Sequence, residues 1–261
     1  MRGMHRLTPW TITALILTLF ALNARAEAVD ITLRLASGTE IVSQRFPAAG
    51  DVLAVWLTEQ GGSSEEEQKA ARDMAAKGVE TWLTDFLSPY FLPLLPSSWA
   101  QVPAREVDAW LEALHQRNPG KRIVLIATGR VSGLALRAAN EWLERHPADA
   151  TRPLAGALLM WPILYNELAP GQEPDYDPIV RHTHLDLVIL QPKSSAGYWW
   201  RERLKNFLVD AGSRVWLNVL PGLRDGFYRR GDITQREPDA GARLGDMLVD
   251  AIQPLLNKDK P

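Results

Sequence analysis

An apolar segment near the middle of the chain runs into a glycine-bounded turn and then into a helix with a small-residue face. Residues 123–128 read Ile-Val-Leu-Ile-Ala-Thr, and the turn lies between Gly129 and Gly133. A strand that is apolar at consecutive positions is buried on both faces, as in a parallel sheet covered by helices. The alanines that follow, Ala138 and Ala139, allow the helix to pack closely on such a sheet. This unit predicts an α/β fold.

The same alternation of apolar strands and amphipathic helices extends over most of the chain. The first two strands alternate in polarity around Ser37-Gly38, which is typical of an antiparallel hairpin. A capping box formed by Ser64 and Glu67 marks the start of one helix. The pattern predicts a three-layer α/β/α sandwich with a mostly parallel sheet and antiparallel opening strands. We expect strands over residues 30–35, 40–44, 52–57, 79–86, 122–128, 154–161, 185–190 and 214–220, and helices over about 64–78, around 107–114, after 133, over 200–211 and over 243–256.

The first 26 residues predict a secretory signal peptide. Arg2 and Arg6 precede an apolar stretch over residues 11–22, and the small-residue sequence Ala24-Arg25-Ala26 follows it. This stretch is about half as long as the roughly 20 residues that span a bilayer, so we expect cleavage near Ala26 and a periplasmic product without a stable membrane span. An uncleaved signal-anchor helix is the alternative. Residues 27–261 contain no linker or repeat and are expected to form a single domain.

Composition and motifs exclude several classes of function. The chain has 29 basic and 31 acidic residues, and removal of the leader with its arginines makes the remainder more acidic. Without a long basic run, this balance argues against nucleic acid or an anionic membrane as the main partner. The absence of cysteine excludes disulfides, thiolate catalysis and zinc–thiolate sites. We expect no metal, because the pair His182 and His184 lacks an accompanying third ligand, and no cofactor.

In order and spacing, residues 30–256 resemble the α/β-hydrolase superfamily. The antiparallel opening strands, the loop with Gln60-Gly61-Gly62, the strand–turn–helix over residues 123–133 and the late strand followed by Pro221-Gly222 occur in the sequence order of that family. The resemblance implies a fold whose active members carry a nucleophile at the tip of the turn, in a G-x-S-x-G frame. A Rossmann fold is the main alternative on topology, but its G-x-G-x-x-G frame is missing.

All three positions of the catalytic triad depart from the family pattern. Aligning Ser132-Gly133 with the closing small pair of the frame places Arg130 at the tip, and a guanidinium cannot attack an acyl carbon. The loop that follows residues 185–190 contains no carboxylate, and Asp225 lies where the histidine is expected. The resemblance therefore implies that the ordinary Ser-His-Asp mechanism is absent.

Ser132 is the best remaining candidate for a displaced nucleophile, two residues beyond Arg130. Its alternative role is that of a small residue at the helix start, where a hydroxyl satisfies backbone N–H groups. The histidines are poorly placed to act as its base. We expect His115 and His146 near helix ends, away from the carboxyl ends of the strands. His182 and His184 precede a strand and are likewise expected away from those ends.

The candidate ligand-binding residues are Gln60, Arg130, Arg224 and Asp225. An arginine above a helix N-terminus forms an anion site together with the free N–H groups of the helix. The alternative is a structural ion pair between Arg130 and Asp225, which the topology brings close together.

Three functional hypotheses follow from these residues. The leading one is a non-catalytic binding or accessory protein of the cell envelope, with a small anionic ligand or an envelope protein as its partner. The alternative is a periplasmic hydrolase of an ester, thioester or amide that uses Ser132. The third is a structural partner whose cleft is filled by its own side chains.

Overall fold

In the part of the chain that the structure describes, eight strands form one sheet in the order β1-β2-β4-β3-β5-β6-β7-β8. The structure is a computed structural model, and it describes residues 27–59, 61–147, 153–166 and 172–257. β1 and β2 form an antiparallel hairpin, β2 pairs antiparallel with β4, and the remaining pairs are parallel, as the sequence predicted. The strands are β1 (Val29–Arg34), β2 (Glu40–Phe46), β3 (Val52–Leu57), β4 (Val79–Thr84), β5 (Arg122–Thr128), β6 (Leu154–Met160), β7 (Leu187–Pro192) and β8 (Val215–Leu220).

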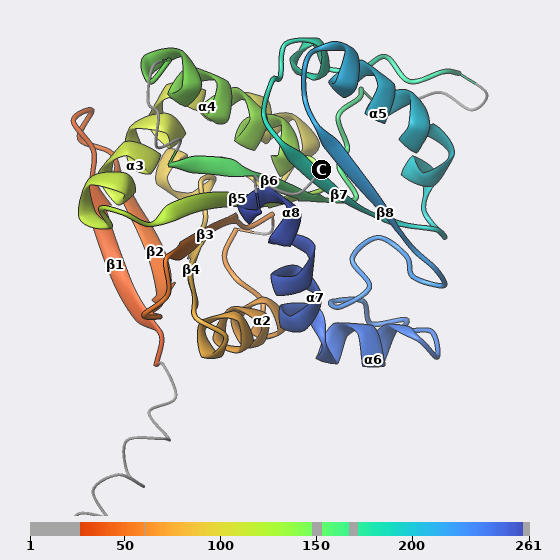
Figure 1. The fold of residues 1–261 in the computed structure, drawn as a ribbon, viewed down its shortest axis with the longest axis horizontal. Helices are drawn as coiled ribbons and strands as arrows, with labels where there is room; N and C mark the ends of the chain where they lie inside the picture. The colour runs from red at the N-terminus through yellow and green to blue at the C-terminus, as the bar shows by residue number, and fades with distance from the viewer. Residues whose placement is uncertain (1–26, 60, 148–152, 167–171, 258–261) are drawn as a thin grey trace, which may run out of the picture.

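Helices cover both faces of the sheet and form the outer layers of the sandwich (Figure 1). One face is covered by α3 (Ala104–Arg117), α4 (Val131–Arg145) and α5 (Arg201–Asp210). The other face is covered by α2 (Glu65–Ala76), α6 (Glu237–Ala242), α7 (Leu244–Ala251) and α8 (Gln253–Leu256). Short 3-10 helices lie in the loops at Ser88–Tyr90, Pro96–Ala100, Pro178–Arg181 and Ala196–Trp200. The expected three-layer arrangement is confirmed.

The sheet divides the core into two apolar clusters. Within β3, Leu53 and Val55 belong to the cluster of α3 and α4, whereas Ala54 and Trp56 belong to the cluster of α2 and α7. Successive side chains of a strand point to opposite faces, so both clusters draw on the same strand. Leu53 lies opposite Ile123 of the neighbouring strand β5. Burial on two sides explains why the central strands are apolar at every position.

Most element boundaries lie within about two residues of the sequence prediction, but β7 lies over 187–192 rather than 185–190, and α6 was not predicted. Two further differences concern β4 and the last helix. β4 ends at Thr84 rather than at residue 86. The single helix expected over residues 243–256 is divided at Ile252 into α7 and α8. Pro254 has no N–H to donate to the carbonyl of the residue four positions earlier, so the hydrogen-bond ladder of α7 cannot continue through it.

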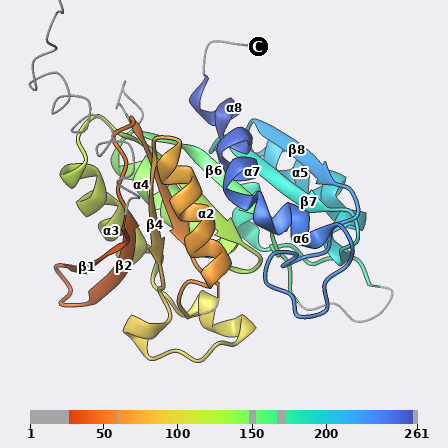
Figure 2. The ribbon, with the colours of Figure 1, turned by 90° about the horizontal axis from the view of Figure 1, so that it is seen from below.

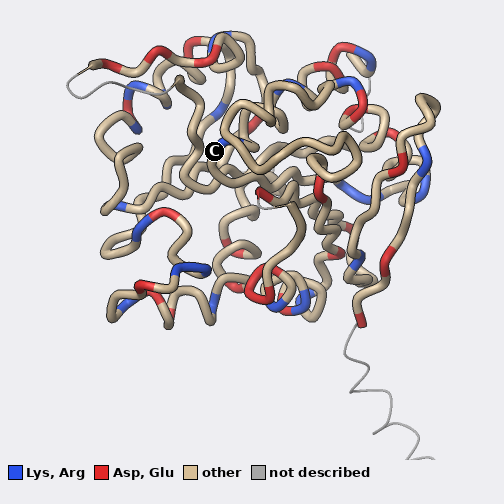
Figure 3. Tube along the Cα trace, turned by 180° about the vertical axis from the view of Figure 1, so that it is seen from behind, with Lys and Arg blue, Asp and Glu red and all other residues tan. Residues whose placement is uncertain are grey.

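The sequence also led to expectations about a signal peptide, a membrane span and the distribution of charge. The predicted signal peptide, residues 1–26, lies outside the described residues. Across the described ranges, we find no helix with both the length and the apolar character needed to cross a membrane. Basic and acidic residues are interspersed along the trace seen from behind (Figure 3).

The loops at the carboxyl ends of the parallel strands meet at one edge of the sheet. In Figure 2, the segment between β4 and α3 and the loop between β8 and α6 extend at the same edge. The turn after β5 and the loop after β3 lie there too, because these strands run parallel to β4. Open α/β sheets bind their ligands outside the carboxyl ends of the strands. A ligand site is therefore expected at this edge.

Candidate functional site

The turn after β5 is formed by Gly129, whose φ of +50° lies in the left-handed region that favours glycine. β5 ends one residue earlier, and α4 begins after Arg130, which has ordinary right-handed φ and ψ of −74° and −23°. The Gly129 N–H donates to the Met160 carbonyl at 3.0 Å, which ties the turn to β6. In a nucleophile elbow, the reactive residue occupies the strained position between strand and helix. The structure places Gly129 at that position.

This result corrects the alignment that placed Arg130 at the tip of the turn. The alignment used Ser132-Gly133 as the closing small pair, but both residues lie within α4 and are buried. Centring the frame on Gly129 puts Ala127 and Val131 at the flanking positions. Glycine has no side chain, so the position of the nucleophile carries no reactive group.

The Glu59 carboxylate fills the space where a side chain at position 129 would begin. A Cβ added to Gly129 would lie 2.2 Å from Glu59 Oε1. The same oxygen accepts a hydrogen bond from the Arg130 backbone N–H at 3.3 Å. In hydrolases of this type, the N–H of the residue after the nucleophile is one donor of the oxyanion hole. Glu59 therefore fills the position that corresponds to the nucleophile of that family and accepts from the N–H that corresponds to its oxyanion-hole donor.

Arg229, from the loop after β8, pairs with the Glu59 carboxylate. Its Nη2 contacts Glu59 Oε2, and its Nη1 lies 3.8 Å from Glu67 Oε1. The Tyr228 hydroxyl donates to the same Glu67 oxygen at 3.0 Å. Burial raises the pKa of Glu67, although Arg229 and the hydrogen bonds to its carboxylate oppose this shift. One largely buried guanidinium thus lies between two carboxylates.

Glu67 also connects this network to the start of α2. Its N–H donates to the Ser64 hydroxyl at 3.2 Å, and its Oε2 accepts the Ser64 N–H at 2.9 Å. The capping box expected from the sequence is therefore confirmed. Because Oε2 caps the helix while Oε1 accepts the Tyr228 hydroxyl, a single carboxylate joins α2 to the loop after β8.

Asp225, which stands in the loop where the histidine was expected, is largely buried at the same edge. Its Oδ1 atom is buried and has no hydrogen-bond partner among the described residues. Burial, together with the Glu59 carboxylate, raises the pKa of Asp225 to about 6, against the opposing effects of Ser195 and Arg230. The loops after β3, β7 and β8 thus bring Glu59, Ser195 and Asp225 near one another.

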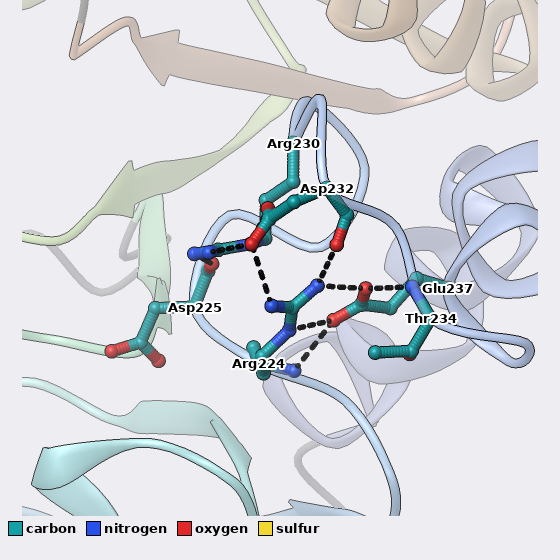
Figure 4. A network of polar contacts seen from close by, with 6 residues as sticks. All are labelled: Arg224, Asp225, Arg230, Asp232, Thr234 and Glu237. Carbon is teal, nitrogen blue, oxygen red and sulfur yellow. Dashed lines mark hydrogen bonds and ion pairs between the residues drawn. The ribbon is translucent and has the colours of Figure 1, made fainter.

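Arg224 has its partners in the loop after β8 and at the start of α6 (Figure 4). Its Nε and Nη2 atoms donate to Glu237 at 2.9 and 2.7 Å, and its Nη1 donates to Asp232 at 3.0 Å. Hydrogen bonds from Arg224 lower the pKa of the buried Glu237 to about 2. The Asp225 carboxylate points away from this network (Figure 4). The ligand-binding role of Arg224 stays a prediction, and Gln60 lies outside the described residues.

Ser132 lies within α4 rather than in the turn. The residue is fully buried, and its Oγ has no hydrogen-bond partner in the described part of the chain. His146 stacks on Trp142, with ring centroids 4.3 Å apart, and His184 Nδ1 lies 3.0 Å from the Ala211 carbonyl oxygen. A serine without a hydrogen-bonded base is not activated for attack. Within the described ranges, no group of three or more potential ligand side chains is arranged to hold a metal ion.

A cleft of about 570 Å³ lies beside the filled site and shares Arg130 with it. Its floor includes Gly133 and Arg137 of α4. Its walls come from residues 95–97, 99 and 100, before α3, from residues 163–166, after β6, and from Asp177. Burial raises the pKa of Tyr165, and Asp225 and Arg130 act on it in opposite directions. Tyr165 therefore lies between the cleft and the filled site.

Sequence reasoning missed Glu59, Glu67 and Arg229 as parts of one network. Glu59 and Arg229 are 170 residues apart in the chain, and no motif links them. The local signal that was available is Gly129 itself. A glycine directly after a buried strand marks the left-handed residue that an elbow requires.

Comparison with known proteins identifies the fold. No family profile matches the chain, and no curated protein matches its sequence. An esterase from Pyrobaculum calidifontis is 14% identical with a TM-score of 0.63, and the match covers 94% of this chain and 89% of that one. One of two fungal esterases from Rhizomucor miehei is 10% identical with a TM-score of 0.64, covering 98% and 93%. A hormone-sensitive lipase from a metagenome library is 15% identical with a TM-score of 0.60, covering 94% of each. Together with the sheet and its helices, these likenesses show that the chain has the α/β-hydrolase fold.

Proposed function

We propose that this protein is a non-catalytic binding protein whose catalytic site is closed by its own side chains. The observation that carries the proposal is the position of the Glu59 carboxylate, which contacts the Arg130 N–H and fills the place of a side chain at Gly129. Arg229 pairs with Glu59 there. A substrate acyl group would have to displace a paired, largely buried carboxylate before its oxygen reached the oxyanion site, and that displacement is costly.

Each chemical role of acyl transfer lacks its residue. Gly129 supplies no nucleophile, and Asp225 stands in the loop of the imidazole that would accept the proton. A carboxylate there can still bind a ligand, but it has no hydroxyl to activate. Ser195 follows β7 in the loop where the acid of the triad is expected. The remaining groups can orient a bound molecule, but they cannot form an acyl-enzyme.

A hydrolase that uses Ser132 is the competing proposal. The esterase neighbours favour it by analogy of fold, but a fold alone does not establish an activity. The burial of Ser132 and its unpartnered hydroxyl among the described residues argue against it.

Covalent labelling separates the two proposals. We expect the purified protein to form no adduct with a fluorophosphonate when its intact mass is measured. A single adduct that is missing from Ser132→Ala would overturn the non-catalytic proposal and identify the nucleophile. Protein that is heat-denatured before labelling is the control for non-specific reaction. An adduct that also forms on the denatured protein does not report an active site.

We further propose that the protein is exported to the periplasm, where it binds a small anionic ligand or another envelope protein. The support is the leader pattern, in which Arg2 and Arg6 precede an apolar stretch that ends in small residues. Amino-terminal sequencing of the protein from a periplasmic extract is expected to begin near Glu27. Recovery of the chain with Met1 intact in the membrane fraction would contradict export with cleavage.

A further inference from the structure

The start of α4 carries two arginines on either side of a glycine. Arg130, Gly133 and Arg137 are separated by three and four positions, so they share one face of the helix. A Cβ added to Gly133 would lie 3.4 Å from Arg137 Nη1 and 3.5 Å from Nη2, so the Arg137 guanidinium lies over the glycine. The Asp177 carboxylate also lines the cleft and lies 3.6 Å from the same Cβ position, so this side of the 570 Å³ cleft carries two guanidinium groups and one carboxylate, with a net positive charge.

Apolar and aromatic side chains form much of the walls of the same cleft. They come from the segment before α3 and from the segment after β6. They are Leu95, Pro96, Trp99, Ile163, Leu164 and Tyr165.

The chain segment that contributes the first of these walls also exposes apolar side chains. Phe91 is 95% exposed and Leu94 is 56% exposed. No charged residue occurs in the sequence between Asp85 and Arg105. The segment that supplies this wall is therefore uncharged and partly apolar at the surface.

We propose that this cleft binds an amphiphilic carboxylate, with the anionic head on the Arg137 guanidinium and an aryl or alkyl body along the apolar walls. The inference rests on the proposed non-catalytic function, since Glu59 fills the oxyanion site and leaves the neighbouring cleft as the place for a ligand.

Arg137 has the hydrogen-bonding capacity for this role. Among the described residues its one partner is Asp177, whose Oδ2 accepts from Nη1 at 2.7 Å. A guanidinium has five N–H donors, so donors remain for a second carboxylate. Two parallel hydrogen bonds from a guanidinium to a carboxylate are strong and geometrically specific. A neutral amide of the same shape cannot reproduce this charge-assisted pair, so the cleft selects for the anion.

Calorimetric titration with 4-phenylbutyrate tests the inference, with 4-phenylbutyramide as the neutral analogue and acetate as the head group alone. We expect the full carboxylate to bind about tenfold or more tightly than either analogue. Arg137→Gln keeps the polar character of the side chain without its charge, and Gly133→Leu fills the floor of the cleft. Each change is expected to weaken binding of 4-phenylbutyrate by about tenfold or more.

The matched control is Arg203→Gln, which removes an exposed arginine of α5 that pairs with Glu173 and should leave the affinity unchanged. Thermal unfolding of each variant shows whether it is folded. If one of the two cleft variants does not fold, the other one alone decides the test. Equal affinity for acid and amide, unchanged affinity in both cleft variants, or no binding of any probe would overturn the inference.

Fluorophosphonate labelling of the same preparation tests the proposed function separately. No binding together with no adduct would overturn the carboxylate cleft and leave the non-catalytic function standing. An adduct lost in Ser132→Ala would overturn the non-catalytic function whatever the titration shows.

Discussion

Two neighbouring regions at the carboxyl edge share Arg130 but differ in how their charged groups are satisfied. Around Gly129, the carboxylate of Glu59 meets both the Arg130 N–H and the Arg229 guanidinium, so the charges are satisfied internally. In the cleft beside α4, Arg137 has a single partner within the described residues, and a volume of about 570 Å³ stays open. The difference teaches that internal ion pairs can fill the space beside the turn after β5 while the fold keeps an adjacent cleft open.

Reversing the closure is expected to have the largest effect. Glu59→Gly removes the carboxylate from the place of the nucleophile, Gly129→Ser supplies a hydroxyl, and Asp225→His supplies a base in the loop after β8. We expect this triple variant to form a single fluorophosphonate adduct where the parent protein forms none, because the hydroxyl then lies beside a vacated oxyanion donor.

The same background with Gly129→Ala in place of Gly129→Ser is the control and should stay unlabelled. An unlabelled triple variant that remains folded would mean that Gly129 or Asp225 does not hold the position assigned to it, and the contrast between the closed and open regions would lose its basis.

Removing the cation of the closed region is expected to have the next largest effect. Arg229→Leu leaves Glu59 and Glu67 without their shared partner, and breaking such a buried pair costs about 3 kcal/mol of the free energy of unfolding. Arg137→Leu in the open region is the matched comparison. Its pair with Asp177 is about one-third exposed, so it should cost less than about 1 kcal/mol. Urea unfolding measures both, and equal losses would contradict the distinction.

A smaller effect with a defined pH dependence is expected from Asp225→Asn. Burial raises the pKa of Asp225 from 3.8 to about 6, so the folded state holds this proton more tightly than the unfolded state. Ionisation of Asp225 therefore destabilises the parent protein as pH rises from about 4 to 6, and the penalty is complete above that range. We expect Asp225→Asn to be more stable by about 2–3 kcal/mol near pH 8 and by less than about 1 kcal/mol near pH 4.

Urea unfolding at both pH values tests this expectation. An advantage of Asp225→Asn that persists undiminished at the acidic pH would show that the effect comes from packing and not from the titration of the carboxylate.

Ser132→Ala is expected to have the smallest effect. The Ser132 hydroxyl is buried without a partner among the described residues, so its removal should change the free energy of unfolding by less than about 0.5 kcal/mol or stabilise the protein slightly. A loss well above 1 kcal/mol would reveal a hydrogen bond that ties Ser132 to the neighbouring structure. Thermal unfolding measured alongside the fluorophosphonate experiment gives this comparison.

The fold could be predicted because its main determinants are local in sequence. Burial on both faces makes β3 and β5 apolar throughout, and the boundaries of both agree with the sequence prediction. The capping box at Ser64 is likewise a property of neighbouring residues. The break between α7 and α8 was also within reach, because Pro254 cannot donate the hydrogen bond that a continuous helix requires.

The site could be predicted only in part. Asp225 was placed correctly in the loop after the last strand, but its neighbour Glu59 belongs to a loop far away in sequence. The helical period contained a further signal, since Ser132 shares a face with Leu136 and Ala139, which are both buried. That spacing indicates a core position rather than a nucleophile. The pairing of Glu59 with Arg229 depends on tertiary structure and has no counterpart in any local pattern.

The double use of Glu67 has a consequence for the order in which the molecule assembles. Its Oε2 caps α2, which is a local contact. Its Oε1 accepts a hydrogen bond from Tyr228, which lies 161 residues later in the chain. Contacts between such distant segments form slowly, because a long loop must close before they contribute. An incomplete polypeptide can therefore begin α2 and yet leave Glu59 and Glu67 without their cation. The space beside Gly129 is therefore closed by paired charges only after the carboxyl-terminal part of the chain has been added, so this closure requires the complete polypeptide.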